Sequence, residues 1–346
     1  MLSYARDAGD AALDRVGRMT KRERVLAALE RRPVDRPPIS FWRHVPDLDH
    51  DPRLLADAML AFHRRWDLDL VKVMSSGVYC VEDWGRQVAY TGSPSGAKRC
   101  VSHAGQSTAD WQRIKPLDPG TGALGRELEA LRLIARSRPD DALILHTVFS
   151  PLTIARKLAG EQLDRDLRAN PGAVVAVLEA ITNTMARYCV AALETGADGV
   201  FFATQAGTSE IFTEAETTTD DLPYARRILE RVKARSSLTM LHVHGKDIFF
   251  DRLVALPVHA VNWHDRPTPS TLTDAKTRFG GAVAGGLAER TTLRNGTVSA
   301  VAAEVSDAIR QTDGRGLIVG PGCVLPLDVP DDALAAAVDA VKVARA

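Results

Sequence analysis

The sequence predicts a (β/α)8 barrel, the TIM-barrel fold, and three observations lead to this α/β class. Short apolar runs, nearly free of charge, alternate with longer amphipathic stretches, as expected of parallel strands that helices cover on both faces. Eight such runs occur, the number of strands that closes this barrel. The 346 residues contain no short repeat and no Gly/Ser-rich linker, so we expect one domain over residues 1–346. A doubly wound sheet is the structural alternative.

The expected strands are rich in Val, Ile, Leu and Phe, and they are the runs 39–42, 70–74, 142–148, 199–203, 238–243, 260–263, 282–285 and 317–320. Between them, apolar residues at helical spacing predict helices over 51–65, 124–136, 171–195, 220–234, 297–311 and 330–344. The last helix begins with Pro330, Asp331 and Asp332, which suit the positive end of a helix dipole. Segment 75–118 is rich in Gly, Ser and Trp, and we interpret it as an excursion that caps the barrel mouth.

Composition excludes several classes of protein. Lys plus Arg and Asp plus Glu both number 44, so a broad basic face for nucleic acid or for an anionic membrane surface is not expected. No apolar run approaches the ~18–20 residues of a membrane helix, and the N-terminal residues lack the apolar core of a secretory signal. The four cysteines lie far apart in the sequence, which is typical of reduced thiols. We therefore expect a cytoplasmic enzyme with a small-molecule substrate, and a homodimer is compatible with this composition.

Polar residues at the ends of the predicted strands are the candidates for a functional site, because barrel enzymes place their active sites at the carboxyl ends of the strands. Arg43 could clamp a substrate carboxylate through two hydrogen bonds, or it could be an ordinary surface arginine. Lys72 and Gln205 are further candidates for substrate binding. These candidates are Arg43, His44, Lys72, Gln205, His242, His244, His264, Asp265 and Cys323.

The sequence Leu-His-Val-His-Gly at 241–245 and the turn Gly-Pro-Gly-Cys at 320–323 together suggest a metal site. Residues i and i+2 of a strand point to the same face, so His242 and His244 would project together. Catalytic zinc sites use three protein ligands from Cys, His and carboxylates, and Cys323 would complete such a set. Alternatively, one histidine forms a hydrogen bond in the core, the other faces solvent, and Cys323 is a small buried hydrophobe.

A third motif, Asn-Trp-His-Asp-Arg, covers residues 262–266. His264 could be a fourth ligand, a hydrogen-bonding partner of the ligands or a general base, and Asp265 could orient an imidazole. We therefore take both as candidate catalytic residues. An ion-paired turn in which Asp265 contacts Arg266 is the alternative.

Five segments that recur in one family span the chain from Lys21 to the C-terminus: RERVLAALERRPVDRPPISFW, HVHG, VNWHD, GGLAERTTLRNGT and GPGCVLPLDVPDDALAAAVDAV. Through them the chain resembles the uroporphyrinogen decarboxylase superfamily, which also contains zinc-dependent cobalamin methyltransferases. The resemblance implies a (β/α)8 barrel with its site at the carboxyl ends of the strands.

The resemblance argues against porphyrin decarboxylation. True decarboxylases carry two arginines in a stretch reading roughly RQAGR; Arg43 matches the first, and Asp47 stands where the second belongs. Their catalytic Asp falls near Ser76 and their active-site Tyr near Lys157. Their late His is replaced by Cys323. A substrate with eight carboxylates needs positive groups that this chain lacks.

The methyltransferase branch binds zinc through His-x-Cys-Gly in the fifth strand and a Cys in a Pro-Gly-Cys turn after the last strand. By this resemblance His242 and Cys323 match two zinc ligands, and His244 stands in place of the remaining Cys. Exchanging Cys for His removes one negative charge and makes the zinc a stronger Lewis acid. The family's Asp before Leu-Asn-Gly-Thr is Ala288 here, which also departs from the pattern.

The resemblance implies zinc-dependent methyl (or other alkyl) transfer, in which zinc activates a thiol or another acceptor. The methyl donor could be a methylated corrinoid carried by a separate protein, since the corrinoid-binding stretch Asp-x-His-x-x-Gly does not occur in this chain. Two alternatives stay open. One is a zinc-dependent hydrolase or lyase for a small carboxylated substrate, with Arg43 as the clamp and His264 as the base. The other is a cofactor-free decarboxylase of a smaller acid.

Overall fold

The computed structural model describes residues 17–101 and 108–344. Its centre is a curled parallel sheet in which every residue of the seven strands is buried. This burial on both faces explains the uninterrupted apolar runs of the sequence. In their order across the sheet, the strands are β1 (Leu70–Val73), β4 (Leu143–Phe149), β5 (Gly199–Thr204), β6 (Leu238–Val243), β7 (Ala260–Trp263), β8 (Ala282–Leu287) and β9 (Leu317–Pro321).

The first predicted strand, over 39–42, is not a regular strand in the structure. Ile39 forms a single parallel bridge with Val319 of β9, and the Ile39 carbonyl accepts a hydrogen bond of 2.9 Å from the Asp69 amide just before β1. Two prolines, at 37 and 38, precede it, and proline lacks the N–H that a longer ladder would need. The structure confirms an α/β fold with a curled parallel sheet, and closure into a full eight-stranded barrel stays a prediction.

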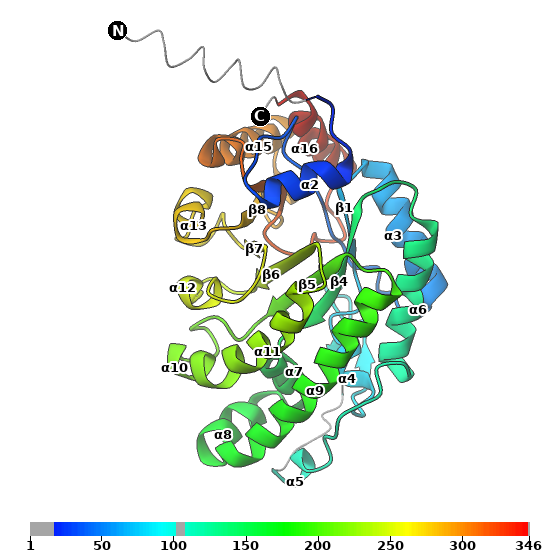
Figure 1. Ribbon diagram of the computed structural model, residues 1–346, viewed down its shortest axis with the longest axis vertical. Helices are drawn as coiled ribbons and strands as arrows, with labels where there is room; N and C mark the ends of the chain where they lie inside the picture. Colours follow the sequence, from blue (N-terminus) through cyan, green and yellow to red (C-terminus); the bar gives the residue numbers. More distant parts are fainter. Residues whose placement is uncertain (1–16, 102–107, 345–346) are drawn as a thin grey trace.

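The six predicted helices are present and surround the sheet (Figure 1). The predicted helix over 220–234 begins with a π-helical turn, η1 (Thr217–Asp221), that the periodicity did not show. The α-helices are α3 (Pro52–Trp66), α6 (Gly122–Ser137), α9 (Pro171–Thr195), α11 (Leu222–Lys233), α15 (Val298–Thr312) and α16 (Asp331–Val343).

Helix α9 is long and apolar enough to cross a membrane by length and composition alone. However, 61% of its most apolar window is buried inside the structure, where α9 packs against α6 and α11. Packing within the protein therefore accounts for its apolar character.

Several further elements were not predicted from periodicity because they are short or weakly amphipathic. Segment 75–118 contains four of them: α4 (Tyr79–Glu82), the antiparallel pair β2 (Val88–Ala89) and β3 (Arg99–Cys100), and α5 (Thr108–Trp111). The others are α7 (Pro151–Ala159), α8 (Glu161–Ala169), α10 (Glu214–Glu216), α12 (Phe250–Leu253), α13 (Leu272–Arg278) and α14 (Thr292–Asn295).

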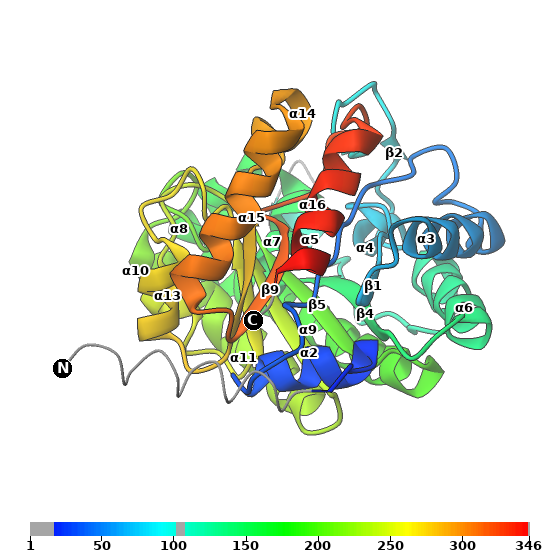
Figure 2. The same cartoon turned by 90° about the horizontal axis from the view of Figure 1, so that it is seen from above.

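Helix α2 (Lys21–Leu29) lies at the end of the sheet where the strands begin. Its Arg24 guanidinium donates to the buried Asp69 carboxylate at 2.6 Å, directly before β1, and Arg22 pairs with Asp198 before β5 at 2.8 Å. Figure 2 shows α2 and α14 at opposite ends of the molecule. Helix α2 therefore covers the amino ends of the strands, and the cavities and polar residues described next lie at the carboxyl ends.

Candidate metal centre

His242 and His244 lie at the carboxyl end of β6, as the two-residue spacing predicts. His242 is paired in register with Asn262 of β7, and the His244 amide still donates to Thr204 of β5 at 3.0 Å. Gly245 then turns the chain with φ of +120°, and a Cβ there would lie 2.8 Å from the Thr208 Cβ. Only glycine fits both the conformation and the space, so this position fixes the direction in which the chain leaves the two histidines.

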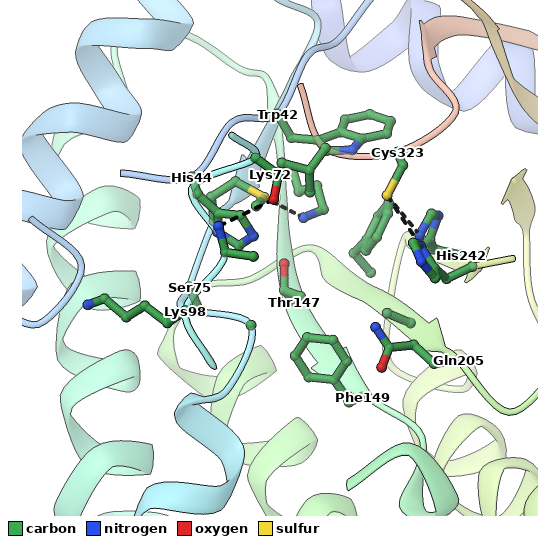
Figure 3. A pocket seen from close by; sticks show the side chains of 18 of the residues that line it. Trp42, His44, Lys72, Ser75, Lys98, Thr147, Phe149, Gln205, His242 and Cys323 are labelled. Atoms are coloured by element: carbon green, nitrogen blue, oxygen red, sulfur yellow. Dashed lines mark hydrogen bonds between the residues drawn. The ribbon is translucent and has the colours of Figure 1, made fainter. Parts of the chain in front are cut away.

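Cys323 reaches the same place from the turn after β9. A Cβ on the preceding Gly322 would lie 2.9 Å from both the Trp263 carbonyl oxygen and the His264 Cα, so the turn packs closely on the end of β7. The Cys323 Sγ lies 3.7 Å from His242 Nε2 and 3.6 Å from His244 Nδ1. The structure therefore brings the three predicted metal ligands together, and Figure 3 shows Cys323 pointing toward His242.

The distances between these three side chains fit one tetrahedral zinc ion. With Zn–N of about 2.05 Å and Zn–S of about 2.3 Å, a tetrahedron has N···S edges of about 3.6 Å. The two observed N···S separations, 3.7 and 3.6 Å, match this edge. All three donor atoms lie within 4.8 Å of one another, and two imidazoles with one thiolate are ligands that zinc prefers.

Asn262 determines which ring nitrogen of His242 carries the proton. Its side-chain nitrogen donates to the carbonyls of Ala284 at 2.9 Å and Pro321 at 3.1 Å. Since carbonyls only accept, the Asn262 oxygen must be the atom that faces His242 Nδ1, at 2.6 Å. Nδ1 therefore carries the proton and Nε2 presents a lone pair toward Cys323, which is the arrangement of a metal-binding histidine held by an outer partner.

His264 stands beside the three candidate ligands. Its Nε2 lies 3.4 Å from His244 Nδ1, and its Nδ1 lies 3.1 Å from the carboxylate of the buried Glu289. Burial lowers the pKa of His264, but the Cys323 thiolate and Glu289 outweigh this effect and raise it to about 9. For Cys323, burial acts to raise the pKa, while hydrogen bonds with His242, His244 and His264 hold it well below its ordinary value. The cluster thus favours a thiolate.

A cavity of about 260 Å³ opens beside the cluster. Its walls include all three candidate ligands, and also Lys72 and Gln205, the two predicted substrate-binding residues that the structure places there. Figure 3 shows Cys323 and His242 together on one wall, with Lys72 and His44 away from them. Trp42, Phe149 and Phe201 provide aromatic walls.

The charges in this cavity are positive and have few anionic partners. Lys72 is 6% exposed, its ammonium lies 4.2 Å from the centre of the Phe201 ring, and its one described hydrogen bond is to the Met74 sulfur. Burial lowers its pKa to about 7, while the Cys323 thiolate opposes this shift. Lys157 likewise lies over the Phe149 ring at 4.7 Å, and burial lowers its pKa as well. Among the described residues, none of those that line this cavity is Asp or Glu.

Other cations of the described structure are paired with carboxylates. Arg24 contacts two aspartates and Arg126 contacts Glu82, and Lys98, which also lines the cavity, contacts Asp49. The ammonium groups of Lys72 and Lys157 are thus exposed to the cavity without the carboxylates that neutralise these other cations. A buried charge without a partner is energetically costly, so these two ammonium groups favour binding of an anion in the cavity.

Two predicted site residues lie apart from the cavity that holds the candidate ligands. The Arg43 guanidinium stacks on the Phe62 ring at 5.3 Å, and Arg43 lines only a small neighbouring cavity, of about 10 Å³, on the other side of Lys72 and Trp42. The Asp265 carboxylate accepts hydrogen bonds of 3.1 Å from the Gly286 amide. Burial raises the pKa of Asp265 to about 7. The structure therefore does not bring Arg43 or the Asp265 carboxylate to the three candidate ligands.

Glu289, Asn262 and Lys157 belong to the site but were not singled out from the sequence. Glu289 is the first acid after β8, and the predicted strand ended two residues early, which separated it from the strand end. Asn262 is the one polar residue within an apolar run, a signal that periodicity alone discards. Lys157 lies in α7, which was not predicted, although the family resemblance already placed an active-site residue near it.

A parallel α/β sheet that carries imidazole and thiol groups at the carboxyl ends of its strands defines a barrel-like enzyme with a candidate metal centre. The profile of the uroporphyrinogen decarboxylase (URO-D) family matches residues 20–343. The chain belongs to this family.

Its relatives indicate the branch. The methylcobamide:CoM methyltransferase MtbA of Methanosarcina mazei is 24% identical over 333 residues, which cover 88% of this chain and 93% of that protein. MtbA of Methanosarcina acetivorans is 23% identical over 340 residues, with coverage of 93% and 98%. A uroporphyrinogen decarboxylase of Roseiflexus sp. is 24% identical but matches 51% of this chain and 56% of its own. The chain is therefore an enzyme of the URO-D superfamily that is closer to the methyltransferase branch.

The fold agrees with this relationship. A solved methyltransferase from Methanosarcina mazei superimposes with a TM-score of 0.82 at 20% identity, covering 94% of this chain and 98% of that one. A B12-independent methionine synthase from Shewanella superimposes with a TM-score of 0.57 at 13% identity, covering 90% and 94%. These likenesses bear on the fold.

Proposed function

We propose that this protein is a zinc-dependent methyl (or other alkyl) transferase that activates a thiol or another acceptor at the carboxyl end of its sheet. The observation that carries the proposal is the set formed by His242, His244 and Cys323 at zinc-compatible separations in the wall of a cavity. Bound zinc would lower the pKa of an acceptor thiol and so supply a nucleophile near neutral pH. Three protein ligands would leave one position for that acceptor.

We infer further that the acceptor carries an anionic group. Lys72 and Lys157 present ammonium groups to the cavity without carboxylate partners, and the buried His44 has an Nδ1 atom without a hydrogen-bond partner in the described structure. Gln205 offers an uncharged amide in the same wall. An acceptor with its thiol toward Cys323 and its anion toward Lys72 would satisfy both ends of the cavity.

His264 and Asp265 have different roles in this proposal. His264 would contact the reacting groups, since its ring borders the ligand set. Asp265 would act through structure, because its carboxylate holds the Gly286 amide and thereby the turn that carries His264. Arg43 stays a proposed substrate contact only for an acceptor long enough to reach beyond the cavity.

The methyl donor is proposed to be a methylated corrinoid on a separate protein, as the methylcobamide in the names of the relatives suggests. We also propose a single cytoplasmic domain in which segment 75–118 caps the site. Ser75, Ser95 and Lys98 of that segment line the cavity, which supports the capping role.

The test combines metal analysis with a methyl-transfer assay. Purified protein is expected to contain about one zinc per chain by elemental analysis. With free methylcobalamin as the donor, it should methylate coenzyme M and 3-mercaptopropionate faster than the neutral 2-mercaptoethanol. Lys72→Met should raise the KM for the anionic thiols by about 10- to 100-fold, as expected for a lost charged hydrogen bond, and Lys72→Arg is the charge-preserving control.

The outcomes separate the alternatives. Zinc without methyl transfer to a thiol or to any other acceptor nucleophile would contradict the transferase and favour a zinc-dependent hydrolase or lyase. Protein that neither retains nor binds zinc would contradict the metal centre and favour a cofactor-free decarboxylase. Equal KM values for charged and neutral thiols would contradict the anionic acceptor alone.

A further inference from the structure

Glu289 stands behind His264 as seen from the candidate zinc ligands. Its Oε1 lies 3.1 Å from His264 Nδ1, and its side chain is 5% exposed. On the other side of the ring, His264 Nε2 lies 3.4 Å from His244 Nδ1. We propose that Glu289 is a positioning residue that acts through His264 on the ligand set and strengthens metal binding. This inference rests on the proposed zinc site.

Glu289 contacts the His264 ring and lies close to the turn that carries Cys323. One oxygen lies 3.1 Å from His264 Nδ1, and the other lies 3.4 Å from the position a Cβ would take on Gly322, directly before Cys323. The carboxylate therefore lies between the His264 ring and the Cys323 turn. Its contact with Nδ1 can fix the ring plane of His264.

The charge of Glu289 also suits the site. One thiolate and two neutral imidazoles around a divalent ion leave a net charge of about +1. A carboxylate next to the His264 ring lowers the positive potential at these ligands. Arg290, the arginine that also pairs with Glu289, is mostly solvent-exposed and lies 3.7 Å away, so it competes only weakly for the carboxylate.

Glu289 acts from the side away from the acceptor cavity. A second cavity, of about 600 Å³, is lined by His264 and Glu289 together with His244 and Glu210. His244 also lines the first cavity, whereas His242 and Cys323 line the first one only. The ligand set therefore stands between two cavities, and a substitution at Glu289 should alter metal binding without altering the lysine end of the acceptor cavity.

The experiment compares Glu289→Ala and Glu289→Gln with Glu210→Ala, a control that removes another carboxylate from the same second cavity. Zinc affinity is measured by competition with a chromogenic chelator, and the cobalt-substituted proteins are compared by visible absorption. Glu289→Ala is expected to weaken zinc binding by about 10-fold, the lower end of the effect of losing a partner that contacts a ligand directly, because Glu289 acts through one further ring, and to shift the cobalt bands. Glu289→Gln can still accept the hydrogen bond from His264, so its zinc affinity should lie between those of the wild type and Glu289→Ala. Glu210→Ala removes the acceptor of the Lys246 amide but no contact with His264, and it should weaken zinc binding less than Glu289→Ala does.

Binding of 3-mercaptopropionate to the metal-free proteins gives the second readout, and it should be unchanged in both Glu289 variants. Zinc affinity of Glu289→Ala and Glu289→Gln within twofold of the wild type would overturn the inference while leaving the proposed function intact. A loss of zinc affinity equal in Glu210→Ala and Glu289→Ala would overturn it as well. A wild-type protein without zinc affinity would remove the proposed function and this inference together.

Discussion

Replacing Asn262 by alanine tests whether the histidine ligands are held by the sheet. The change removes three hydrogen bonds at once and leaves the buried His242 N–H without its acceptor. An orphaned buried group costs about 1–3 kcal/mol and each of the two lost hydrogen bonds to carbonyls about 0.5–1.5 kcal/mol, so the metal-free protein should lose roughly 2–6 kcal/mol of unfolding free energy. Zinc affinity should fall by about 10- to 100-fold, since His242 loses its orienting acceptor.

The assay is urea denaturation of the metal-free protein together with chelator competition for zinc. Asn183→Ala is the control, because Asn183 is exposed on α9 and far from the site in the fold. A variant of Asn262 that loses stability but keeps wild-type zinc affinity would refute the reasoning, since it would show that Asn262 supports the sheet and not the ligand. If the variant kept both wild-type stability and wild-type zinc affinity, the expected roles of Asn262 in the sheet and in orienting His242 would both be refuted.

Four further predictions concern the same end of the molecule. Cys323→Ser should lower the zinc content severalfold, because a hydroxyl replaces the thiolate ligand, while Cys189→Ser on α9 should leave the zinc content unchanged. Burial raises the pKa of Asp265 from 3.8 to about 7, so between these pH values the folded protein holds a proton that the unfolded chain releases. Urea titrations should therefore show that the wild type loses stability relative to Asp265→Asn as the pH rises from about 4 to about 7. Uroporphyrinogen should not be converted to coproporphyrinogen in a fluorescence assay, and conversion at the rate of a true decarboxylase would contradict the departures from the decarboxylase pattern. Limited proteolysis should cut first within 75–118 and leave the remainder as one folded unit; release of two folded halves would contradict a single domain.

Much of the fold was predictable because burial on both faces leaves a strong sequence signal. Seven of the eight expected strands are present within a few residues of their predicted bounds. The run at 39–42 shows the limit of this signal, since its apolar residues are buried as predicted but the prolines before it prevent a regular ladder.

The candidate site was predictable where the chemistry lies within one strand or turn. His242 and His244 share a strand, so their convergence follows from the two-residue period. Glu289 and Lys157 could not be found in this way, because their contacts depend on how β8 and α7 pack beside other elements. Arg43 shows the converse: its position after a strand predicted a substrate contact, but its long side chain lies on Phe62 instead.

The hydrogen bonds of Asn262 also affect how the protein reaches its native state. Cys323 and His242 are 81 residues apart in the chain, and Asn262 connects the strands between them by contacting β6, β8 and the end of β9. The donor set can therefore exist only after these four strands have assembled, so an ion that binds it stabilises the whole carboxyl-terminal half in proportion to the logarithm of free metal. Zinc uptake during refolding should accordingly be a late event, and its rate would report the completion of the sheet.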